Sequence, residues 1–105
     1  IEFLREGYEV ELAFEGESAF KKIKNEFFNI IILDLMIPNI SGEDLCKEIR
    51  KTSDIPIIVL TAKISLISKS KLLNIGADDY ITKPFEIEEL FSRIKIVLKN
   101  KKIRR

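Results

Sequence analysis

The chain has no histidine or tryptophan, and its 105 residues include one cysteine, three prolines and four glycines. Without histidine, the chain by itself cannot form a Ser-His-Asp or Cys-His catalytic arrangement or a histidine-ligated metal site. A single cysteine cannot form an internal disulfide, which excludes a small secreted fold held by disulfides. No apolar run approaches the ~18 residues that a membrane span needs. These absences leave a non-membrane chain without histidine chemistry.

The composition predicts one folded domain with a basic end. Hydrophobic residues make up 46% of the 12.2 kDa chain and charged residues 33%, which is typical of a soluble chain with a core. Five basic residues lie in 99–105, so residues 1–98 carry a net charge of −4. We expect a domain at 1–98, too acidic to bind nucleic acid by itself, and a basic tail or linker start at 99–105. Because the chain begins at Ile1 rather than Met, residues are expected upstream.

Short apolar runs alternate with amphipathic patterns along the chain. Strands are predicted at Tyr8–Phe14, Ile30–Leu33, Ile57–Leu60 and Tyr80–Thr82; helices are predicted at Ile1–Glu6, over the stripe from Ala19 to Phe27, from Ser41 through Ile49, at Leu66–Asn74 and from Ile87 through Leu98. Cys46 falls on an apolar helical stripe and is expected to be a core residue. Alternating strands and helices predict an α/β fold with a doubly wound parallel sheet.

Three polar side chains follow predicted strands, where such sheets bind ligands. Asp34 comes after the first buried run, Thr61 after the second, and Lys83 after the third. Singly, each is more often a loop, turn or surface residue. Together, a carboxylate nucleophile, a hydroxyl and an ammonium make a set suited to phosphoryl transfer. A divalent cation is expected to offset the negative charge.

The segments around these residues resemble the receiver domains of two-component response regulators. The matching segments are Ile30–Pro38 with Ser41-Gly42, Val59–Ala62, and Gly76–Phe85. The resemblance covers essentially the whole chain. It implies a flavodoxin-like sheet with strand order 2-1-3-4-5, a cytoplasmic location and no turnover of an outside substrate.

The resemblance also implies a role for each site residue. Asp34 would accept phosphate from the phosphohistidine of a sensor histidine kinase. Thr61 would turn its hydroxyl toward the phosphoryl group, Tyr80 would follow inward, and Lys83 would pair with the phosphate. The Lys83-Pro84 bond is expected to be cis. Mg²⁺ would bind Asp34 and the backbone carbonyl of Met36.

One part of the family pattern is missing. Two acidic metal ligands normally end the family's first strand, and counting back from Asp34 places them upstream of Ile1. The first strand is therefore expected to be absent from this sequence. Without those acids, metal binding and phosphorylation of this form are in question.

The resemblance further suggests an output. Lys69 with Glu89, and Asp79 with Arg93, are candidate ion pairs across a homodimer, as in OmpR-type transcription regulators; ordinary surface pairing is the alternative. The basic tail would lead to a DNA-binding effector outside this sequence.

Two other functions stay open. A pseudo-receiver would keep the fold as an interaction module without phosphorylation. A haloacid-dehalogenase-type phosphatase would need a second acid two residues after Asp34, where this chain has Met36, which cannot transfer a proton.

Overall fold

The computed structural model describes residues 16–34, 42–61, 74 and 76–104. Their elements, in chain order, are α2 (Gly16–Asn25), β1 (Ile31–Asp34), α3 (Gly42–Arg50), β2 (Ile57–Thr61), β3 (Asp79–Thr82) and α5 (Ile87–Arg104). The predicted helix at Ile1–Glu6, the predicted strand at Tyr8–Phe14 and nearly all of the predicted helix at Leu66–Asn74 lie outside the described residues.

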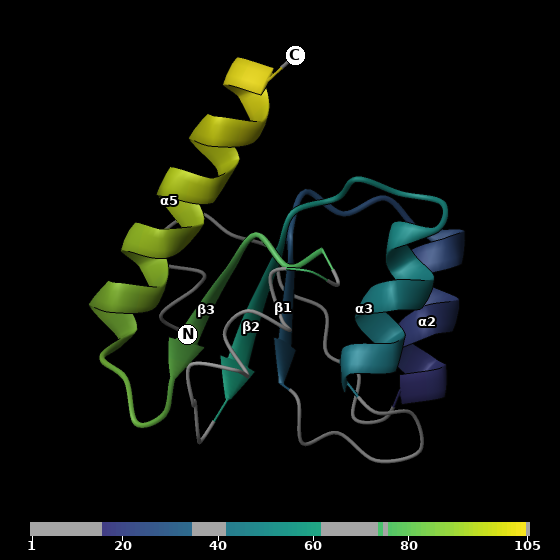
Figure 1. The fold of residues 1–105 in the computed structure, drawn as a ribbon, viewed down its shortest axis with the longest axis horizontal. Helices are drawn as coiled ribbons and strands as arrows, with labels where there is room; N and C mark the ends of the chain where they lie inside the picture. Colours follow the sequence, from purple (N-terminus) through teal and green to yellow (C-terminus); the bar gives the residue numbers. More distant parts are fainter. Residues whose placement is uncertain (1–15, 35–41, 62–73, 75, 105) are drawn as a thin grey trace.

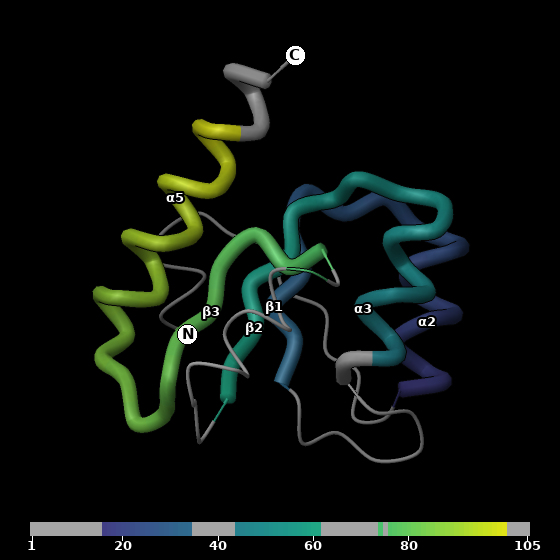
Figure 2. The backbone as a smooth tube through the Cα atoms, viewed as in Figure 1, coloured from purple at the N-terminus to yellow at the C-terminus, as the bar shows by residue number. Residues whose placement is uncertain are grey.

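The three described strands form one parallel sheet in the order β1-β2-β3. Helices α2 and α3 lie side by side on one face of this sheet, and α5 covers the other (Figures 1 and 2). This arrangement confirms the predicted α/β, doubly wound parallel fold. It also brings the carboxyl ends of all three strands to the same edge.

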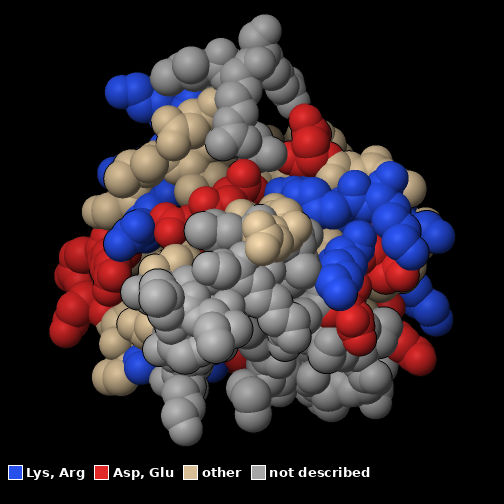
Figure 3. All heavy atoms as spheres, in the orientation of Figure 1, with Lys and Arg blue, Asp and Glu red and all other residues tan. Residues whose placement is uncertain are grey.

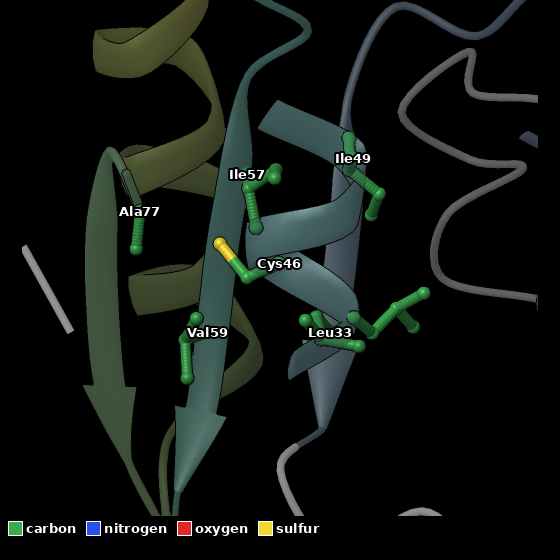
Figure 4. Packing of buried hydrophobic residues seen from close by; sticks show 7 residues of the cluster. Leu33, Cys46, Ile49, Ile57, Val59 and Ala77 are labelled. Atoms are coloured by element: carbon green, nitrogen blue, oxygen red, sulfur yellow. The ribbon is translucent and has the colours of Figure 1, made fainter. Parts of the chain in front are cut away.

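Strand β2, the middle one of the three described strands, has a core on each side. Its alternate residues Ile57 and Val59 join the cluster under α3, while Ile58 joins the cluster under α5. All three are fully buried, because the strand is covered on both faces. Such a strand needs apolar side chains at consecutive positions. Figure 4 shows the α3 side, where Cys46 directs its sulfur toward the sheet. The prediction that Cys46 is a core residue is confirmed.

The strand predictions differ from the structure by one residue at some ends. Asp34, Thr61 and Asp79 belong to the strands, because a polar residue at a strand end can still pair through its backbone. Placing Phe27 on a buried helical stripe was wrong, since its side chain is 85% exposed. Helix α2 ends at Asn25, so the helical spacing no longer applies at Phe27.

Helix α5 runs through Arg104, so the predicted boundary between residues 98 and 99 falls within a helix. Acidic side chains gather at its start (Figure 3), where Glu88 and Glu89 lie in the first turn. Negative charge at a helix amino end is stabilised by the helix dipole. Among the described residues, no helix is both long and apolar enough to cross a membrane.

The buried thiol predicts a dependence of stability on pH. Burial raises the pKa of the Cys46 thiol above its ordinary value of 9.0; nearby Asp78 acts in the same direction and Arg50 opposes both. Above about pH 9 the thiol therefore ionises in the unfolded chain before it does so in the folded chain. The unfolded state then binds fewer protons, and stability falls as pH rises.

Urea unfolding from about pH 7 to about pH 10 tests this expectation on the wild type and Cys46→Ala. The loss of side-chain packing in Cys46→Ala lowers stability by an amount that does not depend on pH. The free-energy difference between the two proteins should therefore shrink above about pH 9. A difference that stays constant through this range would contradict the expectation.

Candidate functional site

The site begins with an ion pair between the two outer strands of the described sheet. Lys83, directly after β3, donates a hydrogen bond from Nζ to Oδ2 of Asp34, the last residue of β1. Neighbouring strands lie roughly 4.8 Å apart, so this contact bridges about 10 Å across the end of β2. Each side chain is 35% exposed, which leaves the pair open to a ligand from solvent.

Thr61 completes this edge from the central strand. It is the last residue of β2 and is 7% exposed. Its backbone carbonyl accepts a hydrogen bond of 2.8 Å from the Lys83 N–H. The strand register pairs Asp34 with Leu60, and Thr61 with Thr82. The structure therefore gathers the three predicted residues, Asp34, Thr61 and Lys83, at one sheet edge.

The other predicted switch residue lies further back along its strand. Tyr80 pairs with Val59 across the ladder, and its half-buried ring packs against the cluster under α3. It is thus on the same face as α2 and α3, two residues before the end of β3. The peptide bond between Lys83 and Pro84 is cis, as expected.

The described residues alone do not fit a magnesium site. Within 16–34, 42–61, 74 and 76–104, no three His, Cys, Asp or Glu residues lie close enough together to hold a metal ion. Asp34 contributes one carboxylate, whereas a divalent cation of this kind needs several oxygen ligands. The backbone carbonyl of Met36, the other ligand named from the sequence, lies outside the described residues.

Of the predicted dimer-face residues, two meet within a single chain. Arg93 donates from Nη1 to Asp79 at 3.1 Å and 3.4 Å from the two carboxylate oxygens. The expected cross-subunit pair is therefore an intrachain pair in this structure. Since the Arg93 side chain is 43% exposed, the pair contributes little to stability. Glu89 is exposed near the start of α5, and Lys69 lies outside the described residues.

The sequence-based reading missed one polar cluster at the opposite edge of the sheet. Arg50, the last residue of α3, contacts Gly76 and Asp78, both just ahead of β3. The sequence offered two weak hints of this cluster. One is a single arginine among the lysines near the end of α3, and the other is the Gly-Ala-Asp sequence that begins at Gly76. Pattern reading could not pair residues that lie 26 and 28 positions apart.

Comparisons with known proteins agree on one family. A family model described as "Response regulator receiver domain" matches residues 1–95. The response regulator ArlR of Staphylococcus haemolyticus is 46% identical over 99 residues, which is 94% of this chain and 45% of that protein. ArlR of Staphylococcus aureus strain Mu50 is 42% identical with the same coverage. The chain thus spans about half the length of these curated relatives.

Solved structures give the same result. A CheY-like response regulator receiver domain from Methanospirillum hungatei matches with a TM-score of 0.89 and 34% identity, covering 98% of this chain and 83% of that one. The receiver domain of the Francisella response regulator 1452 also has a TM-score of 0.89, at 37% identity, with 95% and 84% covered.

Domains of this family are regulatory and work as phosphorylation-based switches. Response regulators receive their phosphate from sensor histidine kinases, and receiver domains generally bind Mg²⁺ at the phosphorylation site. The family match, the relatives, and the carboxylate, hydroxyl and ammonium at one sheet edge lead to the same conclusion: this chain belongs to the response regulator receiver domain family.

Proposed function

We propose that Asp34 is the phosphoacceptor of this receiver domain and that Thr61 and Lys83 bind the phosphoryl group. The observation that carries the proposal is the ion pair between Asp34 and Lys83, with Thr61 beside it at the carboxyl edge of the sheet. A carboxylate held against an ammonium is ionised and able to act as a nucleophile.

In the proposed reaction, one Asp34 carboxylate oxygen attacks the phosphorus of a kinase phosphohistidine. The new O–P bond forms as the P–N bond breaks, and the electron pair stays on the imidazole nitrogen. Lys83 stabilises the negative charge on the transferred group, and the Thr61 hydroxyl donates to one of its oxygens. Water later hydrolyses the acyl phosphate, and no outside substrate is turned over.

Magnesium belongs to the same proposal. The described residues contain no group of three or more His, Cys, Asp or Glu side chains that could hold the ion, so Met36 and further oxygen ligands from outside them would be needed beside Asp34. Mg²⁺ would supply positive charge at the site; no step above depends on it.

Phosphorylation would change the balance between two conformations of the domain. The phosphoryl group adds charge and acceptor oxygens, toward which the Thr61 hydroxyl and then the Tyr80 ring would move. The two conformations would differ at the surface formed by β3 and α5, so a shift in their populations would change that surface.

We further propose a cytoplasmic, OmpR-type regulator in which that surface forms a homodimer. Lys69, Asp79, Glu89 and Arg93 would contribute to its contacts, and the Asp79–Arg93 pair would exchange from intrachain to cross-subunit partners. The receiver would control a DNA-binding effector joined after α5. The curated relatives support this by their length, since this chain covers 45% of ArlR.

Intact mass measured before and after incubation with acetyl phosphate and Mg²⁺ tests the phosphoacceptor proposal. The expected gain is about 80 Da, one phosphoryl group. Hydroxylamine attacks the carbonyl carbon of an acyl phosphate, releases inorganic phosphate and leaves a hydroxamate, whereas a phosphoester is unaffected. Hydroxylamine treatment should therefore remove the phosphoryl mass and leave only the small mass increase of a hydroxamate at Asp34. A folded protein that gains no mass with the donor would support the pseudo-receiver instead.

The pseudo-receiver is the second candidate because the described residues hold no carboxylate cluster. The phosphatase alternative has less support, since Met36 occupies the position of its general acid. A steady release of inorganic phosphate from acetyl phosphate, without a stable mass gain, would favour the phosphatase.

A further inference from the structure

Arg50 forms a polar cluster at the edge of the sheet where the strands begin, opposite the edge that holds Asp34. Its Nη2 donates to Oδ2 of Asp78 at 2.8 Å. Its other donors reach backbone carbonyls: Nε that of Gly76 at 2.8 Å, and Nη1 those of Ile55 at 2.6 Å and Ser53 at 3.3 Å. The guanidinium thus ties the end of α3 to the segments that enter β2 and β3.

Asp78 extends this cluster into the strand ladder. The same Oδ2 that binds Arg50 also accepts the N–H of Ile57, the first residue of β2, at 2.8 Å. In return, the Asp78 N–H donates to the Ile57 carbonyl at 2.9 Å. The Asp78 side chain is 10% exposed and that of Arg50 19%. A charged pair this well buried and hydrogen-bonded is more constrained than a surface ion pair.

The backbone at Gly76 is shaped to admit Arg50. Gly76 has φ +108°, a conformation that side-chain-bearing residues rarely adopt. A Cβ at this position would lie 2.6 Å from Cγ of Arg50. Glycine therefore allows both the turn ahead of β3 and the close approach of the arginine.

The strand that this cluster holds has few other constraints. Strand β3 has four residues and, within the described part of the sheet, pairs only with β2. A slip of one residue would turn Tyr80 to the α5 face and move Lys83 by about 3.3 Å along the strand. Such a slip would separate Lys83 from Asp34.

We infer that Arg50 and Asp78 are positioning residues: they fix the register of β3 on β2 and thereby hold Lys83 against Asp34 at the other edge of the sheet. Asp78 fixes the start of β3 through its hydrogen bond with the Ile57 N–H. The hydrogen bond from the Lys83 N–H to the Thr61 carbonyl follows the last residue of β3. An effect of these residues on phosphoryl transfer rests on the proposed function. Their effect on the register of β3 and on the position of Lys83 does not.

Hydrogen exchange at the Lys83 amide tests this inference without any phosphate transfer. In Asp78→Asn the amide oxygen can still accept the Ile57 N–H, but the charged pair with Arg50 is lost. In Arg50→Lys the charge remains, but one ammonium cannot reproduce the guanidinium contacts. We expect both variants to speed exchange at Lys83 N–H about tenfold or more relative to the Ile94 amide in α5. The NMR signal of the Lys83 ammonium should move toward that of an unpaired lysine.

Arg93→Gln is the matched control because it removes the arginine partner of Asp79, the neighbouring residue, but leaves β2 untouched. Its Lys83 exchange and ammonium signal should match the wild type. Unchanged Lys83 signals in both Asp78→Asn and Arg50→Lys would overturn the inference. Equal acceleration at Lys83 and Ile94 would also overturn it, because the cluster would then support only overall stability.

Discussion

Asparagine in place of Asp34 is expected to abolish phosphoryl uptake from acetyl phosphate. The side-chain amide has nearly the same shape as the carboxylate but carries no charge and is a poor nucleophile, so the O–P bond cannot form. The gain of about 80 Da should disappear from the mass spectrum. This is an all-or-none effect, the largest expected for any single substitution at the site.

Folding has to be separated from chemistry in this variant. Asp34 and Lys83 are each 35% exposed, so loss of their pair should change stability by no more than about 1 kcal/mol. Circular dichroism should therefore show a folded domain. Asp54→Asn is the matched control, since Asp54 is an exposed acid before β2 at the opposite edge, and it should keep the full mass gain. Uptake that persists in Asp34→Asn would mean that another residue accepts the phosphate.

The second large effect is expected from Ile58→Ala in the central strand. Ile58 is fully buried and packs with Ile81 of β3 and Leu90, Phe91, Ile94 and Val97 of α5. Removing its outer carbon atoms loses transfer free energy and leaves a cavity between sheet and helix, costing about 3 kcal/mol. Domains of this size have a free energy of unfolding of only about 5–15 kcal/mol, so the substitution should remove a large share of it.

Urea unfolding followed by circular dichroism gives the free energy of unfolding for this comparison. Ile58→Val is the milder variant, with an expected loss of about 1 kcal/mol. Ile96→Ala is the control, because Ile96 is 53% exposed on α5 and its truncation should cost about 0.5 kcal/mol or less. Equal losses for Ile58→Ala and Ile96→Ala would contradict the two-sided burial of β2.

The sequence was informative about the site because each functional residue followed a short apolar run. A run such as Ile57–Leu60 predicts a strand buried on both faces. In a parallel sheet, the residues at the ends of such runs meet at one edge whatever the details of packing. Asp34, Thr61 and Lys83 could therefore be grouped before any contact among them was known, and the structure brings them together.

Local spacing failed where the chain left its regular element. Phe27 fits the helical spacing of α2, but the helix ends two residues earlier and the ring is 85% exposed. Periodicity describes residues within one helix or strand and gives no information about where that element stops.

By itself, the sequence determined the parallel α/β architecture, the burial of Cys46 and the edge at which the reactive side chains gather. These properties depend on short-range patterns of apolar and polar residues. The tertiary structure alone showed that Arg50 pairs with Asp78, 28 positions away. It also showed that Asp79 and Arg93, paired across a homodimer in the sequence-based hypothesis, meet within one chain. Such pairs arise because packing of the helices on the sheet fixes side-chain distances that no local pattern contains.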